Sequence, residues 1–154
     1  MDEIALRAAE PEDLEQLASM CHALWPETTV DEHAREVLPL LKGAMQSNLP
    51  TVFFVAEHTG AELIGFVQVG LRSHAEGCNP WQPVGYVEAW YVAPAFRRRR
   101  IGARLITAAE EWARSQRCVE MASDTWPANL ESQMAHKALG FEEVERSVNY
   151  RKRL

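Results

Sequence analysis

Residues 91–103 read Tyr91-Val92-Ala93-Pro94-Ala95-Phe96-Arg97-Arg98-Arg99-Arg100-Ile101-Gly102-Ala103. Here an apolar strand passes through a proline turn into four arginines, and the arginines open directly onto a helix. The first-turn amides of a helix have no internal acceptor, and the helix dipole places partial positive charge at the same end. Arginines added there form a socket for a phosphate-bearing ligand. Because the chain carries a net charge of −6, we interpret this concentrated cationic turn as a pyrophosphate site.

Length and composition predict one domain. With 154 residues, 47% of them apolar, the chain can bury a sizeable core, and we place one domain over residues 1–154. It contains no apolar run of about 18 residues, and Met1 to Ile4 contain no basic segment that leads into an apolar one. Neither a membrane span nor a signal peptide is therefore predicted, and the expected location is the cytoplasm.

The cysteines and the charge balance narrow the partners. Cys21, Cys78 and Cys118 are odd in number and lack metal-ligand spacing, so we expect reduced thiols and no metal. The acidic balance argues against nucleic-acid binding, since the basic residues gather in one turn and near the C-terminal end of the sequence. A cationic small molecule is a better match for this charge.

Hydrophobic spacing alternates between the periods of strands and helices. Strands are predicted over residues 4–7, 51–57, 63–71, 84–92, 118–123, 141–146 and 148–153. Helices are predicted to begin at Pro11, Thr29, Ile101 and Leu130, and Gly140 is expected to end the last one. The order β-α-α-β-β-β-α-β-α-β-β predicts an α/β domain with a mixed sheet.

Two of these helices carry marked local features. Thr29 with Glu32 matches a capping box, and Pro39 is expected to kink or split the helix that continues to Met45. In the helix after the arginines, the predicted buried stripe consists of Ile101, Leu105, Ala108 and Trp112. Glu110 and Arg114 are expected to pair on the solvent-exposed face.

This layout and the arginine turn resemble the GNAT acyltransferase superfamily. Its signature is Arg or Gln, two residues, Gly, one residue, then Gly or Ala, and Arg97, Arg100 and Gly102 occupy these places. Arg100 thus replaces the first glycine, which bears on how closely the backbone can wrap a pyrophosphate. Asn129, Ser132 and the pair Gly140-Phe141 match the second signature. The resemblance implies a central mixed, mostly antiparallel sheet flanked by about four helices, with acetyl-CoA as co-substrate.

A more specific resemblance covers most of the chain. It is to the aminoglycoside 6′-N-acetyltransferases, and it is carried by the segments Leu24-Trp25-Pro26, Val87-Glu88-Ala89, Glu120-Met121-Ala122-Ser123-Asp124, Ala138-Leu139-Gly140-Phe141-Glu142-Glu143 and Tyr150-Arg151-Lys152-Arg153. These enzymes use acetyl-CoA, inactivate aminoglycoside antibiotics and are commonly homodimers. The resemblance therefore implies an acetyltransferase for the 6′-amine of such an antibiotic, acting by direct transfer in a ternary complex.

The resemblance also implies where the co-substrate binds. The backbone amides that would face the CoA pyrophosphate belong to Arg98, Arg99, Arg100, Ile101, Gly102 and Ala103. A bulge in the strand that contains Trp90, Tyr91 and Val92 would free backbone groups for the thioester carbonyl and the pantetheine arm. Asn129 would also contact the co-substrate. The alternative for the arginines alone is a solvated basic helix start.

Two carboxylates are the main candidates for holding the acceptor. Glu88 lies inside an apolar strand, where a charge is costly unless it is partnered. The partner would be the protonated amine, whose proton Glu88 could accept directly or through water. The alternative is an edge or salt-bridged glutamate. By the resemblance Asp124 binds ammonium groups of the substrate, and the alternative is an N-terminal cap for the turn before Asn129.

Three further residues match acceptor contacts. Trp25 would wall the sugar pocket or fill the core. Glu145 would contact the substrate and could reach the pocket of a partner subunit. The alternative is a surface glutamate on a strand. His74 lies with Glu76 in the loop over the proposed acceptor site.

The acid for the leaving thiolate has two candidates. His136 stands where many members of the superfamily have a tyrosine, and histidine can donate a proton near neutral pH. Its alternative is a helix residue with a satisfied ring. Tyr150 is the second candidate, and a thiolate can also leave without an acid.

Two other functions remain open from the sequence. The enzyme could acetylate another amine, such as a protein N-terminus or a polyamine. A non-catalytic module that senses acyl-CoA and regulates a partner is the third reading, which the Arg100 departure and the missing tyrosine keep open.

Overall fold

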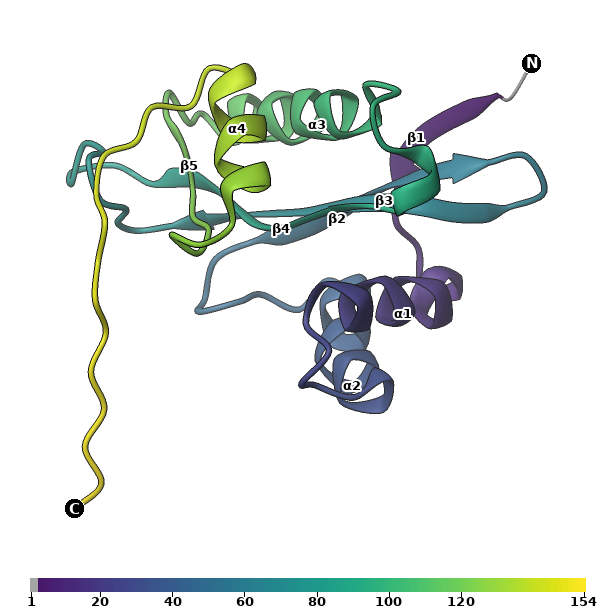
Figure 1. Cartoon of the computed structure of the whole chain (residues 1–154), viewed down its shortest axis with the longest axis horizontal. Coiled ribbons are helices and arrows are strands. Elements are labelled where there is room, and N and C mark those ends of the chain that lie inside the picture. Colours follow the sequence, from purple (N-terminus) through teal and green to yellow (C-terminus); the bar gives the residue numbers. More distant parts are fainter. Residues whose placement is uncertain (1–2) are drawn as a thin grey trace.

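The computed structural model describes residues 3–154 and shows a central sheet with helices on both faces (Figure 1). The strands are β1 (Ile4–Ala8), β2 (Thr51–His58), β3 (Glu62–Arg72), β4 (Val84–Val92) and β5 (Met121–Ser123). The helices are α1 (Leu14–Leu24), α2 (Val30–Leu41), α3 (Ile101–Ser115) and α4 (Leu130–Ala138). Short 3₁₀ turns precede α1 and α3, at Pro11–Asp13 and Pro94–Phe96.

The strands follow the order β1-β2-β3-β4-β5 across the sheet. The first four are antiparallel, and β5 pairs in parallel with β4 after the crossover through α3. A core cluster that includes Leu17 and Phe66 joins α1 and α2 to one face, and a second cluster that includes Val67 and Leu105 joins α3 to the other. The expected mixed, mostly antiparallel sheet with four helices is confirmed.

The local helix predictions hold with two corrections. The capping box is present, because Glu32 N donates to Thr29 Oγ1 at 3.2 Å and Thr29 N donates to Glu32 Oε2 at 2.9 Å. Pro39 does not split α2, which ends two residues later, before Met45. A proline in the last turn removes one hydrogen bond, so the helix ends there rather than breaking in its middle.

The buried stripe of α3 differs in part from the prediction. Its fully buried members are Ile101, Leu105, Ile106, Ala109 and Ala113, whereas Ala108 and Trp112 are half-buried. The predicted pair on the outer side is present, with Arg114 Nη2 at 3.5 Å from Glu110 Oε2. In the second half of the helix, each buried position therefore lies one residue after the predicted one.

The two strands predicted over residues 141–146 and 148–153 do not form, and the prediction is wrong for this chain. Beyond the start of this segment the tail leaves the body of the molecule in an extended course (Figure 1). Val148 is 76% and Tyr150 93% exposed. Alternating apolar residues make a strand only where a neighbouring strand accepts the backbone hydrogen bonds. The strand β5 is also shorter than predicted and begins at Met121 rather than Cys118.

A bulge in β4 changes which side chains face each helix layer. Gln68 of β3 lies opposite Ala89 and Val69 lies opposite Val87, which leaves Glu88 as the extra residue. Val87 packs in the α3 cluster and Ala89 in the α1–α2 cluster, although residues two apart in a regular strand share a face. The bulge therefore takes Glu88 out of the regular alternation.

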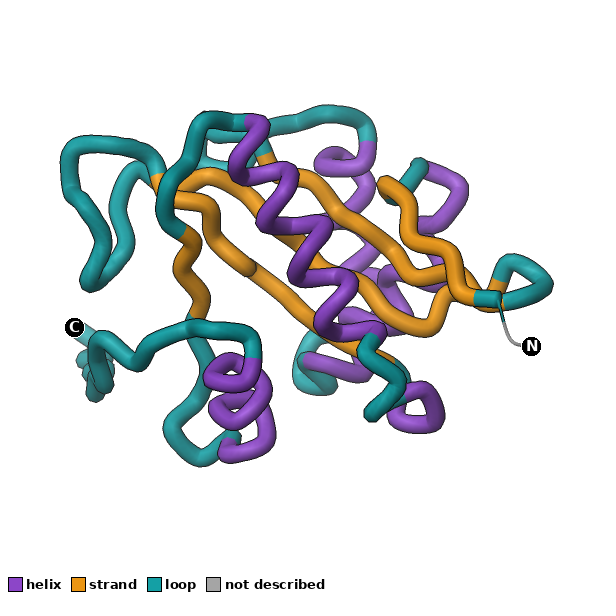
Figure 2. The backbone as a smooth tube through the Cα atoms, turned by 90° about the horizontal axis from the view of Figure 1, so that it is seen from above, coloured by secondary structure: helices purple, strands orange, loops and turns teal. Residues whose placement is uncertain are grey.

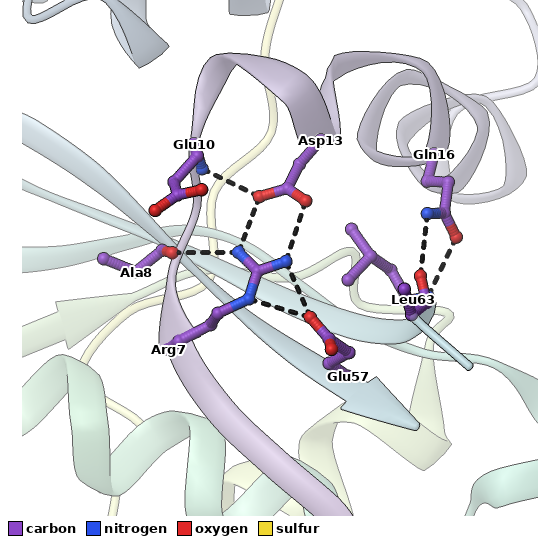
Figure 3. Close-up of polar contacts among 8 residues, drawn as sticks. Arg7, Ala8, Glu10, Asp13, Gln16, Glu57 and Leu63 are labelled. Atoms are coloured by element: carbon purple, nitrogen blue, oxygen red, sulfur yellow. Dashed lines mark hydrogen bonds and ion pairs between the residues drawn. The ribbon is translucent and has the colours of Figure 1, made fainter. Parts of the chain in front are cut away.

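A buried ion pair ties the N-terminal strand to the start of α1 (Figure 3). The Arg7 guanidinium donates to both oxygens of Asp13, at 2.7 and 2.9 Å, and to Glu57 at 2.8 Å. Asp13 is 7% exposed and also accepts from the backbone N–H of Glu10 at 2.8 Å. The bonds to Arg7 hold the pKa of Asp13 below its ordinary value.

Replacing Asp13 with Asn should lower the free energy of unfolding at neutral pH by about 2 kcal/mol, because charge-assisted bonds are lost. A depressed carboxyl pKa gives stability that is present above the unfolded pKa of about 3.9 and is lost as the pH falls through the folded value. In urea titrations, the gap between wild type and variant should therefore narrow toward pH of about 3. Glu12→Gln, a matched change at an exposed neighbour, should show little effect, and an equal gap at both pH values would contradict this account.

Candidate functional site

The arginine turn bends through two residues with left-handed backbone conformation. Arg98 has φ +63° and Arg100 has φ +61°. Arg100 thus occupies, at a cost of about 1–2 kcal/mol, a conformation that glycine adopts freely. This is the position where Arg replaces the expected glycine. The turn keeps its shape without the glycine, because the surrounding structure holds Arg100 in place.

The start of α3 presents backbone donors. The hydrogen bond from Arg104 N to Arg100 O, at 3.0 Å, is the first of the helix. The amides of Ile101, Gly102 and Ala103 precede it and have no acceptor within the helix. Gly102 adds no side chain here, since a Cβ at this position would lie 3.2 Å from the Trp90 ring. Its carbonyl accepts from the Trp90 indole at 3.2 Å, which fixes this helix end over β4.

The four arginine side chains do not act as one group. Arg97 Nε donates to Val92 O at 2.9 Å, and its guanidinium lies 5.9 Å from the Tyr91 ring centre, so Arg97 stabilises the turn. The Arg99 guanidinium lies 5.2 Å from the centre of the Phe96 ring. Arg100 lines a hollow of about 470 Å³ between α3 and β1, together with Leu6 and others. Arg100 thus borders a different part of the surface from the Trp90 contact of Gly102.

The strands β4 and β5 separate beside this helix start. They pair only from Gly85 with Met121 to Val87 with Ser123. Beyond this point, no strand within residues 3–154 pairs with that edge of β4, and the chain after β5 turns toward α4 (Figure 2). The backbone of residues 90–92 therefore borders an open edge, as required of groups that bind a ligand. The bulge expected at these residues lies instead at Glu88 and opposes β3.

His136 lies at the point of separation, but both ring nitrogens are already bonded. Nε2 lies 2.8 Å from Ser123 Oγ, and Nδ1 lies 2.7 Å from the Ser132 carbonyl. A carbonyl accepts only, so Nδ1 donates and Nε2 accepts from the Ser123 hydroxyl. The ring also packs edge-on against Trp90, with centroids 5.4 Å apart. This geometry favours the satisfied-ring alternative over a proton donor.

Asn129 caps α4, with its side-chain oxygen accepting from Ser132 N at 3.0 Å. This bond uses only the side-chain oxygen, so both N–H donors of the side-chain amide remain for other partners. Asn129 is exposed, and it is the last residue of the connection between β5 and α4. The cap and a ligand contact are therefore compatible.

Glu88 lies on β4 and Asp124 directly follows β5, and a series of contacts connects the two carboxylates. Arg72, the last residue of β3, binds Glu88 through two hydrogen bonds of 2.7 Å. The Arg72 guanidinium lies 3.5 Å from the centre of the Tyr86 ring, and the Tyr86 hydroxyl donates to Asp124 at 2.7 Å. Burial is the main cause that raises the pKa of Tyr86, and the hydrogen bond to Asp124 raises it further. The phenol therefore stays protonated and acts as a donor. The residue that caps α4 is Asn129 and not Asp124.

Trp25 ends α1 and is half-buried against the α1–α2 cluster, where Tyr91 also packs. Its ring lies 6.2 Å from that of His33, whose Nε2 lies 3.2 Å from the Trp25 carbonyl. A second hollow, of about 370 Å³, lies between α1 and the start of β3 and reaches Tyr91. Neither hollow is lined by Glu88 or Asp124.

Three of the candidate residues lie apart from this group. His74 is exposed in the loop after β3, with Nε2 at 3.4 Å from Glu76 Oε1. Glu145 and Tyr150 lie on the extended tail, which one chain does not bring to the carboxylates (Figure 1). The tail contacts the loop only near its start, where a Cβ on Gly77 would lie 2.7 Å from Val144.

Two members of the site were not identified from the sequence. Arg72 and Tyr86 connect Glu88 with Asp124, yet neither stands in a recognisable motif. Arg72 closes a strand of alternating residues, and Tyr86 lies in a β-rich run. The usable signal was the buried charge of Glu88, which requires a cationic partner within the fold or in a ligand.

Comparisons with known proteins agree with this geometry. Residues 14–141 match the Acetyltransferase (GNAT) family. The chain is 38% identical over 149 residues to the aminoglycoside N(6′)-acetyltransferase type 1 of Klebsiella aerogenes, covering 97% of this chain and 96% of that protein. The protein of the same name from Serratia marcescens is 38% identical over 144 residues, with 93% and 94% covered.

Solved structures give the same result. AAC(6′)-Iy in complex with the bisubstrate analog CoA-S-monomethyl-acetylneamine superposes with a TM-score of 0.86 at 35% identity, covering 99% of each chain. The complex of AAC(6′)-Iy with CoA gives a TM-score of 0.88 at 35% identity, covering all of this chain and 97% of the other.

Proposed function

The chain belongs to the GNAT acetyltransferase family, and from this premise we propose that it transfers acetyl from acetyl-CoA to the 6′-amine of aminoglycosides. The relatives that cover nearly the whole chain bear that name, and one similar structure holds an analog that joins CoA to an aminoglycoside. We take residues 1–154 as one such domain.

One arrangement carries the proposal. The open edge of β4 separates a donor-rich helix start from a pair of carboxylates. The amides of Ile101 to Ala103 suit the pyrophosphate of CoA, because a helix start binds anions through its free N–H groups. Glu88 and Asp124 suit the ammonium groups of a polycationic sugar. A thioester that lies along the open edge of β4 would reach an amine held on the carboxylate side.

The proposed reaction is a direct transfer. The neutral 6′-amine attacks the thioester carbon, a C–N bond forms, the C–S bond breaks and CoA leaves as the thiolate. Backbone N–H groups of residues 90–92 would stabilise the charge on the carbonyl oxygen. Glu88 would accept the proton of the amine, directly or through water, and Asp124 would orient a second ammonium group. We assign His136 to the support of Trp90 and Ser123 and not to proton donation.

The test is a turnover assay that measures CoA thiol release with a panel of amines. We expect turnover with kanamycin, a single added acetyl group on the 6′-nitrogen by mass spectrometry and NMR, and little turnover with peptide N-termini or spermidine. Rapid turnover with those amines and none with kanamycin would show that the acceptor is another kind of amine. CoA binding without turnover on any amine would favour a sensor module and contradict the proposal.

We also propose that the chain works as a homodimer through its tail. Residues 142–154 are extended and exposed and include Val144, Val148 and Tyr150 as large apolar side chains. An extended segment with these residues needs a partner strand, and a second copy can supply one. In the dimer, Glu145 and Tyr150 would lie near the partner subunit's acceptor site. Removing residues 147–154 should convert a dimer into a monomer in light scattering, and a monomeric full-length protein would contradict the proposal.

The expected location is the cytoplasm. Cys21, Cys78 and Cys118 are free thiols, as is usual in a reducing compartment. Burial raises the pKa of the Cys21 thiol to about 12, which keeps it protonated and unreactive. Within residues 3–154, no helix has both the length and the apolar character needed to cross a membrane.

A further inference from the structure

Arg72 links the two carboxylates assigned to the acceptor. Its Nε donates to Glu88 Oε1 and its Nη2 to Oε2, each at 2.7 Å. The guanidinium also stacks on Tyr86, whose hydroxyl donates to Asp124. The four side chains form a continuous series of contacts from Glu88 through Arg72 and Tyr86 to Asp124, across β3, β4 and the residue that follows β5.

The fold makes this series possible. The bulge takes Glu88 out of the alternation of β4, while Arg72 closes β3 opposite Val84. Burial of the Tyr86 ring, which is 7% exposed, gives the guanidinium a fixed flat surface. The guanidinium is therefore held on one face by the Tyr86 ring and along one edge by the Glu88 carboxylate.

The ion pair leaves Glu88 able to bind a second donor. A carboxylate has about four acceptor positions, and a bidentate arginine uses two of them. The Glu88 side chain is 17% exposed, so solvent or a ligand reaches part of it. An amine can therefore bind Glu88 while Arg72 remains in place.

We propose that Arg72 is a positioning residue for the acceptor amine, because it holds the Glu88 carboxylate in one orientation before the substrate binds. The inference rests on the proposed function. A flexible glutamate would lose several rotamers when the amine binds, and the two-point bond to Arg72 places that cost in folding instead. The planar fork also explains why lysine would be a poor substitute, since an ammonium cannot bind both oxygens in this geometry.

The test begins with Arg72→Ala, measured with kanamycin and acetyl-CoA. We expect kcat/KM to fall by about 30- to 100-fold, as a misplaced reacting group does, with the Kd for CoA within about twofold. Arg72 is 43% exposed, and exposed ion pairs contribute little to stability, so the thermal midpoint should change little. Arg72→Lys should recover part of the rate. Arg114→Ala, which breaks an arginine–glutamate pair on α3, should leave kcat/KM unchanged.

Two measurements separate positioning from a structural role. Guanidinium ions added at concentrations below those that unfold the protein should restore much of the lost rate of Arg72→Ala and none of that of Glu88→Gln. The double variant should be no slower than Glu88→Gln alone, because Arg72 acts through Glu88.

The outcomes discriminate between the two proposals. A wild type that acetylates no aminoglycoside overturns the proposed function and this inference with it. An active wild type whose Arg72→Ala variant is equally active, more active, unrescued by guanidinium, or additive with Glu88→Gln overturns this inference alone.

Discussion

Glu88→Gln is expected to lower kcat/KM for kanamycin by about 100- to 1000-fold, the range lost when a group that holds or accepts a reacting proton is removed. Glutamine keeps the size and shape of the side chain but cannot accept the proton of an ammonium group. It also removes one of the two oxygens that accept from Arg72, together with the negative charge of the pair. The measurement is steady-state kinetics by CoA thiol release.

The assigned roles make the binding of CoA the decisive control. Glu88 lies on the carboxylate side of β4 and contacts Arg72, while the donor amides belong to α3. Calorimetry should therefore give a Kd for CoA within about twofold of wild type, because Glu88 is not among the groups assigned to the pyrophosphate. Glu110→Gln is the matched control, since Glu110 also pairs with an arginine but lies on the outer side of α3. Equal losses in CoA affinity and turnover would contradict the division of roles.

Features that depend on neighbouring residues could be predicted from the sequence. The capping box at Thr29, the start of α3 after the arginines and the strand pattern up to Val92 need only adjacent side chains and regular periods. The resemblance also located Glu88 and Asp124, because the short segments around them are specific. The structure then places both carboxylates in one series of contacts.

Features that depend on pairing could not be predicted. The bulge at Glu88 shifts the alternation of β4, and although the resemblance implied a bulge in this strand, the sequence does not place it at Glu88. Without the bulge, the partner of Glu88 could not be identified as Arg72, although an internal salt bridge was one of the two alternatives. The tail has the alternation of a strand but no neighbour in its own chain. A strand needs a neighbouring strand, and no strand within residues 3–154 pairs with the tail.

Gly102→Asp should weaken CoA binding by about 100-fold, the effect of losing one or two charge-assisted hydrogen bonds of roughly 1.5–3 kcal/mol each. An added carboxylate at the second residue of α3 would lie among the free amides and repel a phosphate there. The same carboxylate suits the dipole of the helix start, so the helix should persist. The measurement is calorimetric titration with CoA, together with thermal unfolding to verify the fold.

Matched variants separate charge from bulk, since any side chain at residue 102 approaches Trp90. Gly102→Asn has nearly the same size as the aspartate variant without its charge, and should retain about tenfold more affinity at low salt. Thr107→Asp adds the same charge to an exposed position of α3 that lines the hollow toward β1, and should leave the Kd nearly unchanged. If all three variants bind CoA as wild type does, the pyrophosphate does not lie at the start of α3. The amides of Ile101 to Ala103 would then have no part in binding CoA.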